Sequence, residues 1–279
     1  MMILDLNNVM FASVLMTLNK SKEKDIDVDL LGHIVFNSIR NLNSKFKKDY
    51  GPLIIATDSS KYWRRDQFPY YKAARKKQRD ASDLNWNKIF ENMHLVKNDL
   101  KDIFPYKYIE VEGAEADDII GVICSNNKTD NILIISSDKD YLQLQTNSNI
   151  KQYDPVNNKF VTTDNAKEYL FEHIIRGDSG DGIPNIASLS NCFVLGQRQK
   201  RITQKLLDSL SNIENEPESE YYQNYMRNKQ LVDLTQVPID ISTGIMEQHN
   251  AENTKDRSKL WSYFLKKKMK VLAENINDF

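Results

Sequence analysis

The segment GAEADDII, residues 113–120, places the carboxylates of Glu115, Asp117 and Asp118 within four residues and then becomes apolar. Two like charges about 4 Å apart repel by roughly 4 kcal/mol at an effective dielectric constant near 20. The apolar continuation predicts a helix that begins here and has one buried face, which limits how far these acids can turn towards water. A bound metal cation would offset their repulsion.

Further carboxylates follow short apolar runs that are typical of buried strands. The runs 1–4, 52–56 and 131–136 are each followed within two residues by an Asp, and a fourth run, 108–111, precedes the acidic segment. Because the carboxyl ends of parallel strands meet at one edge of a sheet, and ligands bind outside that edge, we expect these acids to share one cleft. With the acids of the loop RGDSGDGIP, the candidate ligands are Asp5, Asp58, Glu115, Asp117, Asp118, Asp138, Asp140, Asp178 and Asp181.

The types of ligand indicate which ion such a cleft would hold. Carboxylate oxygens without Cys or His donors favour hard ions such as Mg²⁺ or Mn²⁺ over zinc. Two such ions can clamp the attacking and leaving oxygens of a phosphoryl displacement. We therefore expect two Mg²⁺ ions, for which Mn²⁺ can substitute. The four histidines are scattered along the chain, and we expect them to be structural or exposed.

Each acid taken singly has a simpler interpretation. An Asp after a strand is often only the N-cap of the next helix, and an acidic first turn can be a solvated one that the helix dipole favours. Independent caps, however, have no reason to gather at one edge of a sheet. The combined pattern therefore favours a shared metal site.

Residues 61–79, KYWRRDQFPYYKAARKKQR, carry eight basic side chains against one Asp, interleaved with aromatic ones. Lys and Arg can neutralise phosphates, and tyrosines can stack on splayed bases. The alternative is a solvated helix with a few buried aromatic side chains. Because the segment follows Asp58 directly, we expect its cations to hold a nucleic-acid backbone beside the carboxylate cleft. Two other basic stretches are residues 197–205 and 255–270.

The chain of 279 residues is 40% hydrophobic and has a net charge of −1, which is typical of a globular protein of one or two domains. Its two distant cysteines indicate a reducing compartment with neither a disulfide framework nor a zinc site. The apolar run 9–18 lacks a basic segment before it, so it is not a signal peptide, and no run is long enough to span a membrane. We expect a cytoplasmic protein without membrane contact.

Helical periodicity over residues 28–46, 85–103 and 115–125 alternates with the four apolar runs. This alternation predicts an α/β fold with a twisted, mostly parallel sheet and helices on both faces. After residue 155 the pattern changes, and helices are predicted over 164–177 and 202–210. We expect an α/β domain over residues 1–160, with a basic segment of about 61–90, and a mainly helical region over 161–279.

Five motifs, in this order, resemble those of the 5′-nuclease (flap endonuclease) family. They are LDLNN (4–8), ATDSSKYWRRDQFPYYKAARKKQR (56–79), GAEADDII (113–120), SSDKDYLQL (136–144) and GDSGDGIPNI (177–186). The basic segment and the C-terminal residues are most similar to the ribonuclease H branch of T-even-type bacteriophages. The resemblance spans nearly the whole chain and implies a PIN-like 5′-nuclease fold, with a helix–hairpin–helix-like DNA-binding element in the helical region.

The resemblance also implies roles for individual residues. The first ion would be held by Asp5, Asp58, Glu115, Asp117, Asp118 and Asp138, and the second by Asp140, Asp178 and Asp181. Lys72 and Arg75 would grip the scissile phosphate and, with Asp138, are the predicted catalytic residues. Other nucleic-acid contacts would come from Arg64, Arg65, Tyr70, Tyr71, Lys76 and Arg79. Because neighbouring residues of a helix point about 100° apart, Glu115, Asp117 and Asp118 cannot all ligate directly.

The sequence departs from the family pattern at two places. The segment after GDSGDGIP lacks the glycines and the Lys-Thr pair of the family's hairpin, so Arg198, Lys200, Arg201 and Lys205 would hold the duplex phosphates instead. Only four residues precede Asp5, without the arm by which relatives reach a sliding clamp, so a clamp contact is not expected. A single-strand DNA-binding protein is a candidate partner of the helical region, and we expect a monomer.

The sequence thus predicts a Mg²⁺-dependent 5′→3′ nuclease with exonuclease, flap endonuclease and ribonuclease H activities. It would remove RNA primers and short 5′ flaps from DNA during replication. One alternative is a PIN-like ribonuclease acting on single-stranded RNA, against which the long basic segment and the GDSGD loop argue. The other is a flap-binding protein without catalysis, against which the retention of every motif carboxylate argues.

Overall fold

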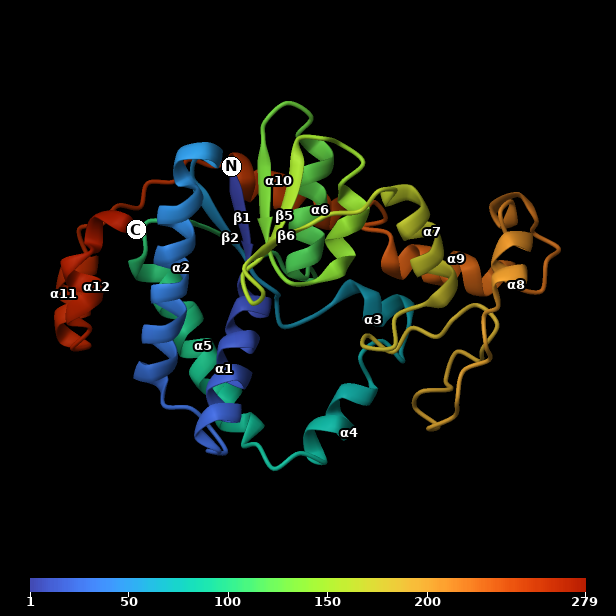
Figure 1. Ribbon diagram of the computed structural model, residues 1–279, viewed down its shortest axis with the longest axis horizontal. Helices are drawn as coiled ribbons and strands as arrows, with labels where there is room; N and C mark the ends of the chain where they lie inside the picture. The colour runs from blue at the N-terminus through green and yellow to red at the C-terminus, as the bar shows by residue number, and fades with distance from the viewer.

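The computed structural model describes residues 1–279, and its centre is a six-stranded sheet (Figure 1). The strand order is β3-β2-β1-β4-β5-β6, in which β1 to β5 run parallel and β6 is antiparallel to β5. The strands are β1 (Met2–Asp5), β2 (Leu53–Ala56), β3 (Lys107–Ile109), β4 (Ile132–Ile135), β5 (Ile150–Asp154) and β6 (Lys159–Val161). The first four overlap the predicted apolar runs, and their parallel pairing confirms the predicted sheet.

Helices cover both faces of the sheet. They are α1 (Leu6–Ser21), α2 (Val28–Tyr50), α5 (Trp86–Ile103), α6 (Ala116–Asn126) and α10 (Ile239–Asn250). Side chains of β1 alternate between two cores: Met2 and Leu4 join the core with α1, α2 and α5, whereas Ile3 joins the core with α6 and α10. A strand that is buried on both faces needs apolar residues at every position, which is why these strands are continuous apolar runs.

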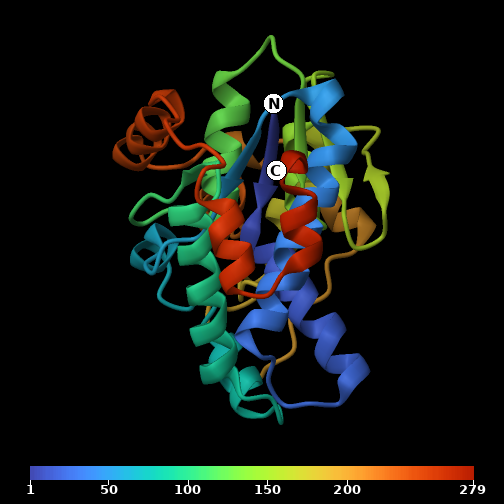
Figure 2. The same ribbon diagram turned by 90° about the vertical axis from the view of Figure 1, so that its left-hand side faces the viewer.

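The chain after residue 165 is mainly helical, as predicted. Its remaining helices are α7 (Ala166–Arg176), α8 (Gln204–Ser209), α9 (Tyr222–Val232), α11 (Leu260–Lys266) and α12 (Lys270–Glu274). Helices α7, α8 and α9 lie at one end of the molecule around a third core, which includes Ile174, Leu207 and Tyr225 (Figure 1). Helices α11 and α12 lie at the other end, where Leu260 and Phe264 join the core beneath α2 (Figure 2).

Some elements were not among the predicted ones. Helix α1 contains the apolar run 9–18 and starts directly after β1. The hairpin of β5 and β6 forms one edge of the sheet. The basic segment forms two short helices, α3 (Trp63–Gln67) and α4 (Ala74–Asp80), and short 3₁₀ helices span Lys139–Leu144, Ile213–Asn215 and Ile276–Asp278. None of the helices combines the length and apolarity needed to cross a bilayer.

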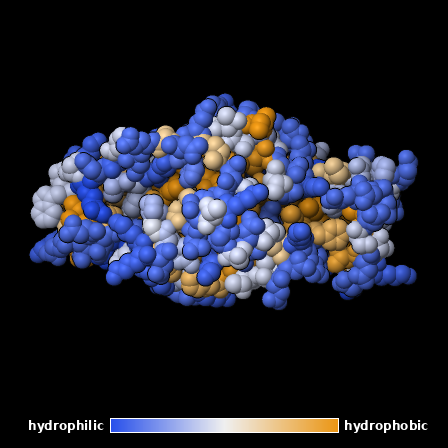
Figure 3. Space-filling model, turned by 90° about the horizontal axis from the view of Figure 1, so that it is seen from above, coloured by the Kyte–Doolittle hydropathy of each residue, from blue (hydrophilic) through white to orange (hydrophobic).

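The two ends of the parallel strands face opposite sides of the molecule. The amino ends lie towards the face seen in Figure 3, which is largely hydrophilic with scattered apolar patches. The carboxyl ends point the other way, towards α1, α4 and the loop that follows α7 (Figure 1). The fold therefore brings the predicted acids and the basic segment to the same side of the sheet.

Candidate active site

A cleft of about 370 Å³ opens at the carboxyl ends of β1, β2 and β4. Eight of the nine predicted acids line it, together with two cations. Its charged lining residues are Asp5, Asp58, Lys72, Arg75, Glu115, Asp117, Asp138, Asp140, Asp178 and Asp181. Strand β1 lies between β2 and β4, where the order of the strands reverses direction, and open α/β sheets bind ligands at this position.

Asp5 ends β1 and caps α1, with Oδ1 accepting from the Asn8 N–H at 3.1 Å. Its Oδ2 accepts from the hydroxyls of Ser136, at 3.1 Å, and Tyr141, at 3.0 Å. Burial and the nearby carboxylate of Asp58 raise the pKa of Asp5 to about 7. The three donors fix the orientation of this carboxyl group, but its negative charge is unfavourable until a cation joins it.

Asp58 and Asp138 each use only one carboxylate oxygen to bind the backbone. Asp58 Oδ1 accepts from the backbone N–H of Ala116 at 2.9 Å, which ties the end of β2 to the start of α6. Asp138 Oδ1 accepts from the Asp140 N–H at 3.0 Å and caps the 3₁₀ helix after β4. The second oxygen of each side chain has no hydrogen-bond donor, and both residues line the cleft. One oxygen therefore organises the backbone while the other can bind an ion.

The structure corrects the prediction for Asp118, which does not line the cleft. Its side chain is fully buried and accepts from Trp63 Nε1 at 3.1 Å and from Arg64 Nη1 at 2.9 Å, and Arg64 Nη2 forms an ion pair with its Oδ1 at 2.8 Å. It also accepts from the Glu115 N–H at 2.9 Å, which completes a capping box at the start of α6. The turn of the helix points Asp117 into the cleft and Asp118 away from it.

Arg64 is likewise placed differently from the prediction that it contacts nucleic acid. Its side chain is 1% exposed, lies 3.1 Å from Glu115 as well as against Asp118, and donates to the Leu231 carbonyl oxygen at 2.8 Å. A buried carboxylate is stable only when its charge is paired, and Arg64 provides that pairing for the two acids. We conclude that Arg64 is a structural cation of the acidic helix start.

The position of Tyr71 corrects a third prediction, that its ring contacts nucleic acid, because a buried ring cannot stack on a base. It is 1% exposed, and its hydroxyl lies 2.8 Å from both Glu115 Oε2 and Asp181 Oδ2. The ammonium group of Lys72 contacts Glu115 and lies 3.5 Å from Asp181. Tyr71 and Lys72 thus join the acidic helix start to the loop RGDSGDGIP.

Arg75 contacts the Asp181 carboxylate and donates to the Gly180 carbonyl oxygen at 3.2 Å. Burial alone would raise the pKa of Asp181, but Lys72 and Arg75 hold it below its usual value. The pKa of Glu115, by contrast, is raised by burial despite Lys72 and Arg64. Lys72 and Arg75 are thus held by carboxylates at the cleft.

A second cavity of about 290 Å³ shares Asp58, Lys72 and Arg75 with the cleft. Arg65 and Arg79, both predicted to contact nucleic acid, line it, and so does Lys97, which was not predicted. Lys97 belongs to the amphipathic helix α5, and no motif around it in the sequence indicates a role at the site. The basic segment and α5 therefore form a cationic wall next to the carboxylates.

The other predicted nucleic-acid contacts lie outside these two cavities. Lys76 is exposed on α4, and Tyr70 is half-buried and packs edge-on against Phe68. The four cations of the stretch 197–205 are exposed on and next to the loop before α8; they are Arg198, Lys200, Arg201 and Lys205. The backbone of this loop is fixed by Asn185, whose side chain donates to the Lys200 carbonyl oxygen at 2.7 Å.

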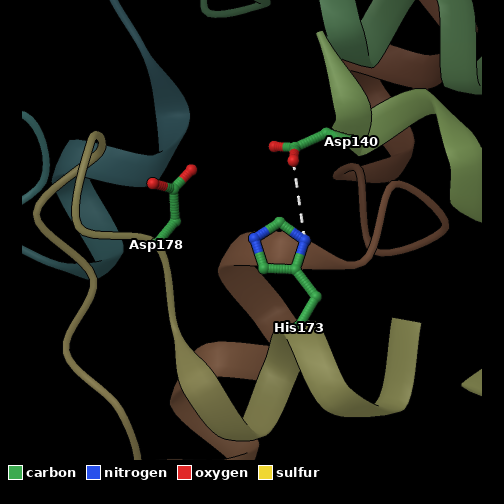
Figure 4. Close-up of side chains that lie close together, drawn as sticks. All are labelled: Asp140, His173 and Asp178. Carbon is green, nitrogen blue, oxygen red and sulfur yellow. Dashed lines mark ion pairs between the residues drawn. The ribbon is translucent and has the colours of Figure 1, made fainter. Parts of the chain in front are cut away.

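His173, which we expected to be structural or exposed, lies beside the carboxylates of Asp140 and Asp178 (Figure 4). It comes from α7, and its Nδ1 is 3.5 Å from Asp140 Oδ1. Burial, followed by Asp138, Asp178 and Asp181, raises the pKa of Asp140 well above its usual value. No local pattern in the sequence indicates this contact, because it depends on how α7 packs against the 3₁₀ helix after β4.

The donor set of the cleft suits divalent cations. Eight carboxylates face only two lining cations, and burial together with neighbouring acids raises the pKa of Asp5, Asp117, Asp140 and Asp178. Burial is the larger cause of these raised pKa values, and the neighbouring acids add negative potential that the protein itself does not fully compensate. Oxygen donors at this density are those that Mg²⁺ and Mn²⁺ prefer.

Comparison with known proteins agrees with this geometry. Residues 1–172 match the family described as 5′-3′ exonuclease, N-terminal resolvase-like domain, and residues 165–279 match the T4 RNase H C-terminal family. The chain is 32% identical to ribonuclease H of Enterobacteria phage T4 over 273 residues, which cover 92% of this chain and 89% of that protein. It is 24% identical to the flap endonuclease Xni of Shewanella woodyi over 206 residues, covering 70% of this chain and 75% of that enzyme.

Solved structures show the same fold. The flap endonuclease of bacteriophage T5, crystallised with DNA and metal ions, matches with a TM-score of 0.61 and 20% identity, covering 90% of this chain and 99% of that one. The T5 5′-exonuclease with bound zinc matches with a TM-score of 0.61 and 17% identity, covering 89% and 98% of the two chains. The sheet, the acidic cleft and the family matches lead to one conclusion: the chain belongs to the 5′-3′ exonuclease family of nucleases and carries the C-terminal region typical of T4 RNase H.

Proposed function

We propose that this protein is a Mg²⁺-dependent 5′→3′ nuclease that removes RNA primers and short 5′ flaps from DNA during replication. The observation that carries the proposal is the cleft in which eight carboxylates face Lys72 and Arg75, next to a cationic wall. Acids alone would bind ions, and cations alone would bind a phosphate backbone. Phosphodiester hydrolysis needs both at one place, and the cleft brings them together.

Two Mg²⁺ ions would be held by two groups of side chains. The ligands of the first would come from Asp5, Asp58, Glu115, Asp117 and Asp138, and those of the second from Asp140, Asp178 and Asp181. When bound, such ions lower the pKa of the attacking water and stabilise the leaving oxygen. Ser136 and Tyr141 would keep the carboxylate of Asp5 oriented towards the first ion.

Lys72 and Arg75 would exchange their partners during the reaction. In the structure both cations contact carboxylates that could also ligate metal, with Lys72 on Glu115 and Arg75 on Asp181. An ion bound by these carboxylates would weaken their hold on Lys72 and Arg75. The freed cations would then stabilise the negative charge that develops on the scissile phosphate.

The substrate would be DNA, or an RNA–DNA hybrid, with a free 5′ end or flap. Arg65, Arg79 and Lys97 would hold the strand next to the cleft, and the exposed cations of residues 197–205 would contact duplex phosphates farther away. We propose that the protein acts as a monomer in the cytoplasm, and that a single-strand DNA-binding protein is a partner of its helical region.

A cleavage assay with resolved products tests the proposal. A 5′-labelled flap and a labelled RNA–DNA primer hybrid are each incubated with the protein and Mg²⁺, and the product lengths are measured. The proposal predicts cleavage from the 5′ end and none in excess chelator. Asp138→Asn should abolish cleavage but not DNA binding, whereas Asp49→Asn, an exposed acid on α2, should have no effect. Cleavage of single-stranded RNA without a 5′ end, or flap binding without any product, would contradict it.

A further inference from the structure

The cluster of Asp140, His173 and Asp178 places an imidazole next to a group of carboxylates. Asp140 lies in the 3₁₀ helix after β4, His173 on α7, and Asp178 in the loop directly after α7. One potential ligand atom from each lies within 4.8 Å of the other two. Figure 4 shows the imidazole ring below and between the two carboxylates, with its two nitrogens on the sides of Asp140 and Asp178.

The potential ligand atoms of this cluster lack hydrogen-bond partners. His173 Nδ1 is 3.5 Å from Asp140 Oδ1, which is longer than a hydrogen bond, and this buried nitrogen has no hydrogen-bond partner. No hydrogen-bond donor reaches either carboxylate oxygen of Asp140. Asp178 accepts from the Gly180 and Asp181 N–H groups through Oδ1, so its Oδ2 is free.

An ion between these atoms would satisfy all three side chains. Adjacent ligands of an octahedral ion with bonds of about 2.1 Å lie roughly 3 Å apart, so His173 Nδ1 and Asp140 Oδ1, now 3.5 Å apart, need only a small inward movement. The imidazole is also held in place, because its ring packs edge-on against Tyr169, one turn earlier on α7, at a centroid distance of 5.8 Å. Its side chain is only 14% exposed.

We propose that His173 is a direct nitrogen ligand of the ion held by Asp140 and Asp178, and that it raises the affinity of this site for transition-metal ions while Mg²⁺ still binds through the carboxylates. The inference rests on the proposed function for the presence of divalent ions in the cleft. Mg²⁺ binds oxygen ligands and gains little from an imidazole. Affinity for nitrogen donors rises from Mn²⁺ to Co²⁺, so both ions gain from His173, and Co²⁺ gains more.

Metal titration of the full-length chain tests this assignment without an activity assay. Affinities for Mg²⁺, Mn²⁺ and Co²⁺ are measured by calorimetry on the wild type and on His173→Gln. We expect the substitution to weaken Co²⁺ binding about tenfold or more, Mn²⁺ binding less, and Mg²⁺ binding by under about twofold. His249→Gln, which removes an imidazole at the opposite edge of the sheet, is the matched control and should leave all three affinities unchanged.

A spectroscopic measurement on the wild type does not depend on the variant folding. Pulsed electron paramagnetic resonance of bound Mn²⁺ should show modulation from a histidine nitrogen, and His173→Gln should lose it. No nitrogen modulation in the wild type, or an equal loss of affinity for all three ions in His173→Gln, would overturn the inference and leave His173 with only a positioning role. The proposed function is tested separately, because Mg²⁺-dependent cleavage and its loss in Asp138→Asn do not require a nitrogen ligand.

Discussion

The backbone N–H of Lys72 donates to the carbonyl oxygen of Asp181 at 2.7 Å, while the ammonium group of Lys72 lies 3.5 Å from the carboxylate of the same residue. Lys72 adopts a left-handed conformation, with φ of 56°, that a non-glycine residue rarely takes. The basic segment is thus fixed to the loop RGDSGDGIP by both backbone and side chain. This double contact places the predicted phosphate-binding cation at the carboxylates.

The buried and exposed arginines of the basic segment should behave differently when each is replaced by Gln. Arg64→Gln leaves the buried Asp118 without a cation and Glu115 with Lys72 alone, and it should lower the free energy of unfolding by about 3–5 kcal/mol. Arg65→Gln, at an exposed position, should change stability by less than about 0.5 kcal/mol. It should instead weaken DNA binding and reduce, by about one, the slope of the logarithm of the DNA-binding constant against the logarithm of the salt concentration.

Urea unfolding and DNA titration at several salt concentrations measure these effects on the same two variants. Equal stability of Arg64→Gln and Arg65→Gln would contradict the structural assignment of Arg64.

Two glycines share a φ of 67° but differ in what surrounds them, and Gly177 also has an extended ψ of −174° that adds to its strain. At Gly196 an added Cβ meets nothing within 4 Å, so Gly196→Ala should cost only the left-handed strain of about 1–2 kcal/mol. At Gly177 an added Cβ would lie 2.3 Å from the Ile183 carbonyl oxygen and 2.6 Å from Pro184, so Gly177→Ala should cost clearly more. Because Gly177 precedes Asp178, this variant should also weaken metal binding.

Urea unfolding ranks the two glycine variants, and calorimetry with Mn²⁺ measures the effect on the ion. Equal stability of Gly177→Ala and Gly196→Ala would contradict the close packing described around Gly177.

The stability of the metal-free protein should decrease as the pH rises from about 4 to about 7. The pKa of Asp5 is about 7 in the folded state, against an ordinary value of 3.8, so in this range the folded state binds a proton that the unfolded state has lost. Stability falls with pH wherever the folded state binds more protons. Asp117, Asp140 and Asp178 act in the same direction.

Thermal unfolding in chelator, followed across this pH range, measures the effect. Asp5→Asn should reduce the dependence of the melting temperature on pH. Saturating Mg²⁺, added in place of chelator, should oppose the loss of stability towards pH 7. Asp49→Asn should leave the pH dependence and the effect of Mg²⁺ unchanged. A metal-free wild type whose melting temperature rises towards neutral pH would be inconsistent with the buried acids described above.

The sheet and most of the cleft could be predicted because their signals are local. An apolar run followed by an Asp marks a buried strand and its carboxyl end, and parallel pairing then forces Asp5, Asp58 and Asp138 to one edge. Helical geometry also predicts that Asp117 and Asp118 point in different directions. It does not say which of the two faces the cleft, because that depends on the helix packing against Trp63 and Arg64.

The residues that were missed or misplaced depend on packing between distant segments. Arg64 and Arg65 are neighbours in one basic run, and only the orientation of the short helix α3 buries the first and exposes the second. His173 and Lys97 lie on amphipathic helices where their residue types carry no special meaning. Their place beside the cleft follows from how α7 and α5 pack, which a local pattern does not encode.

The most direct test of the account is calorimetric titration of Mg²⁺ into the metal-free protein near pH 7, repeated in buffers of different ionisation enthalpy. The account predicts saturable binding of two ions with release of protons, because acids with raised pKa values must ionise to hold them. Asp138→Asn should lose at least one of these ions, and Asp49→Asn should keep both. Absence of saturable binding, or identical titrations of Asp138→Asn and the wild type, would contradict the claim that this carboxylate cleft is a metal centre.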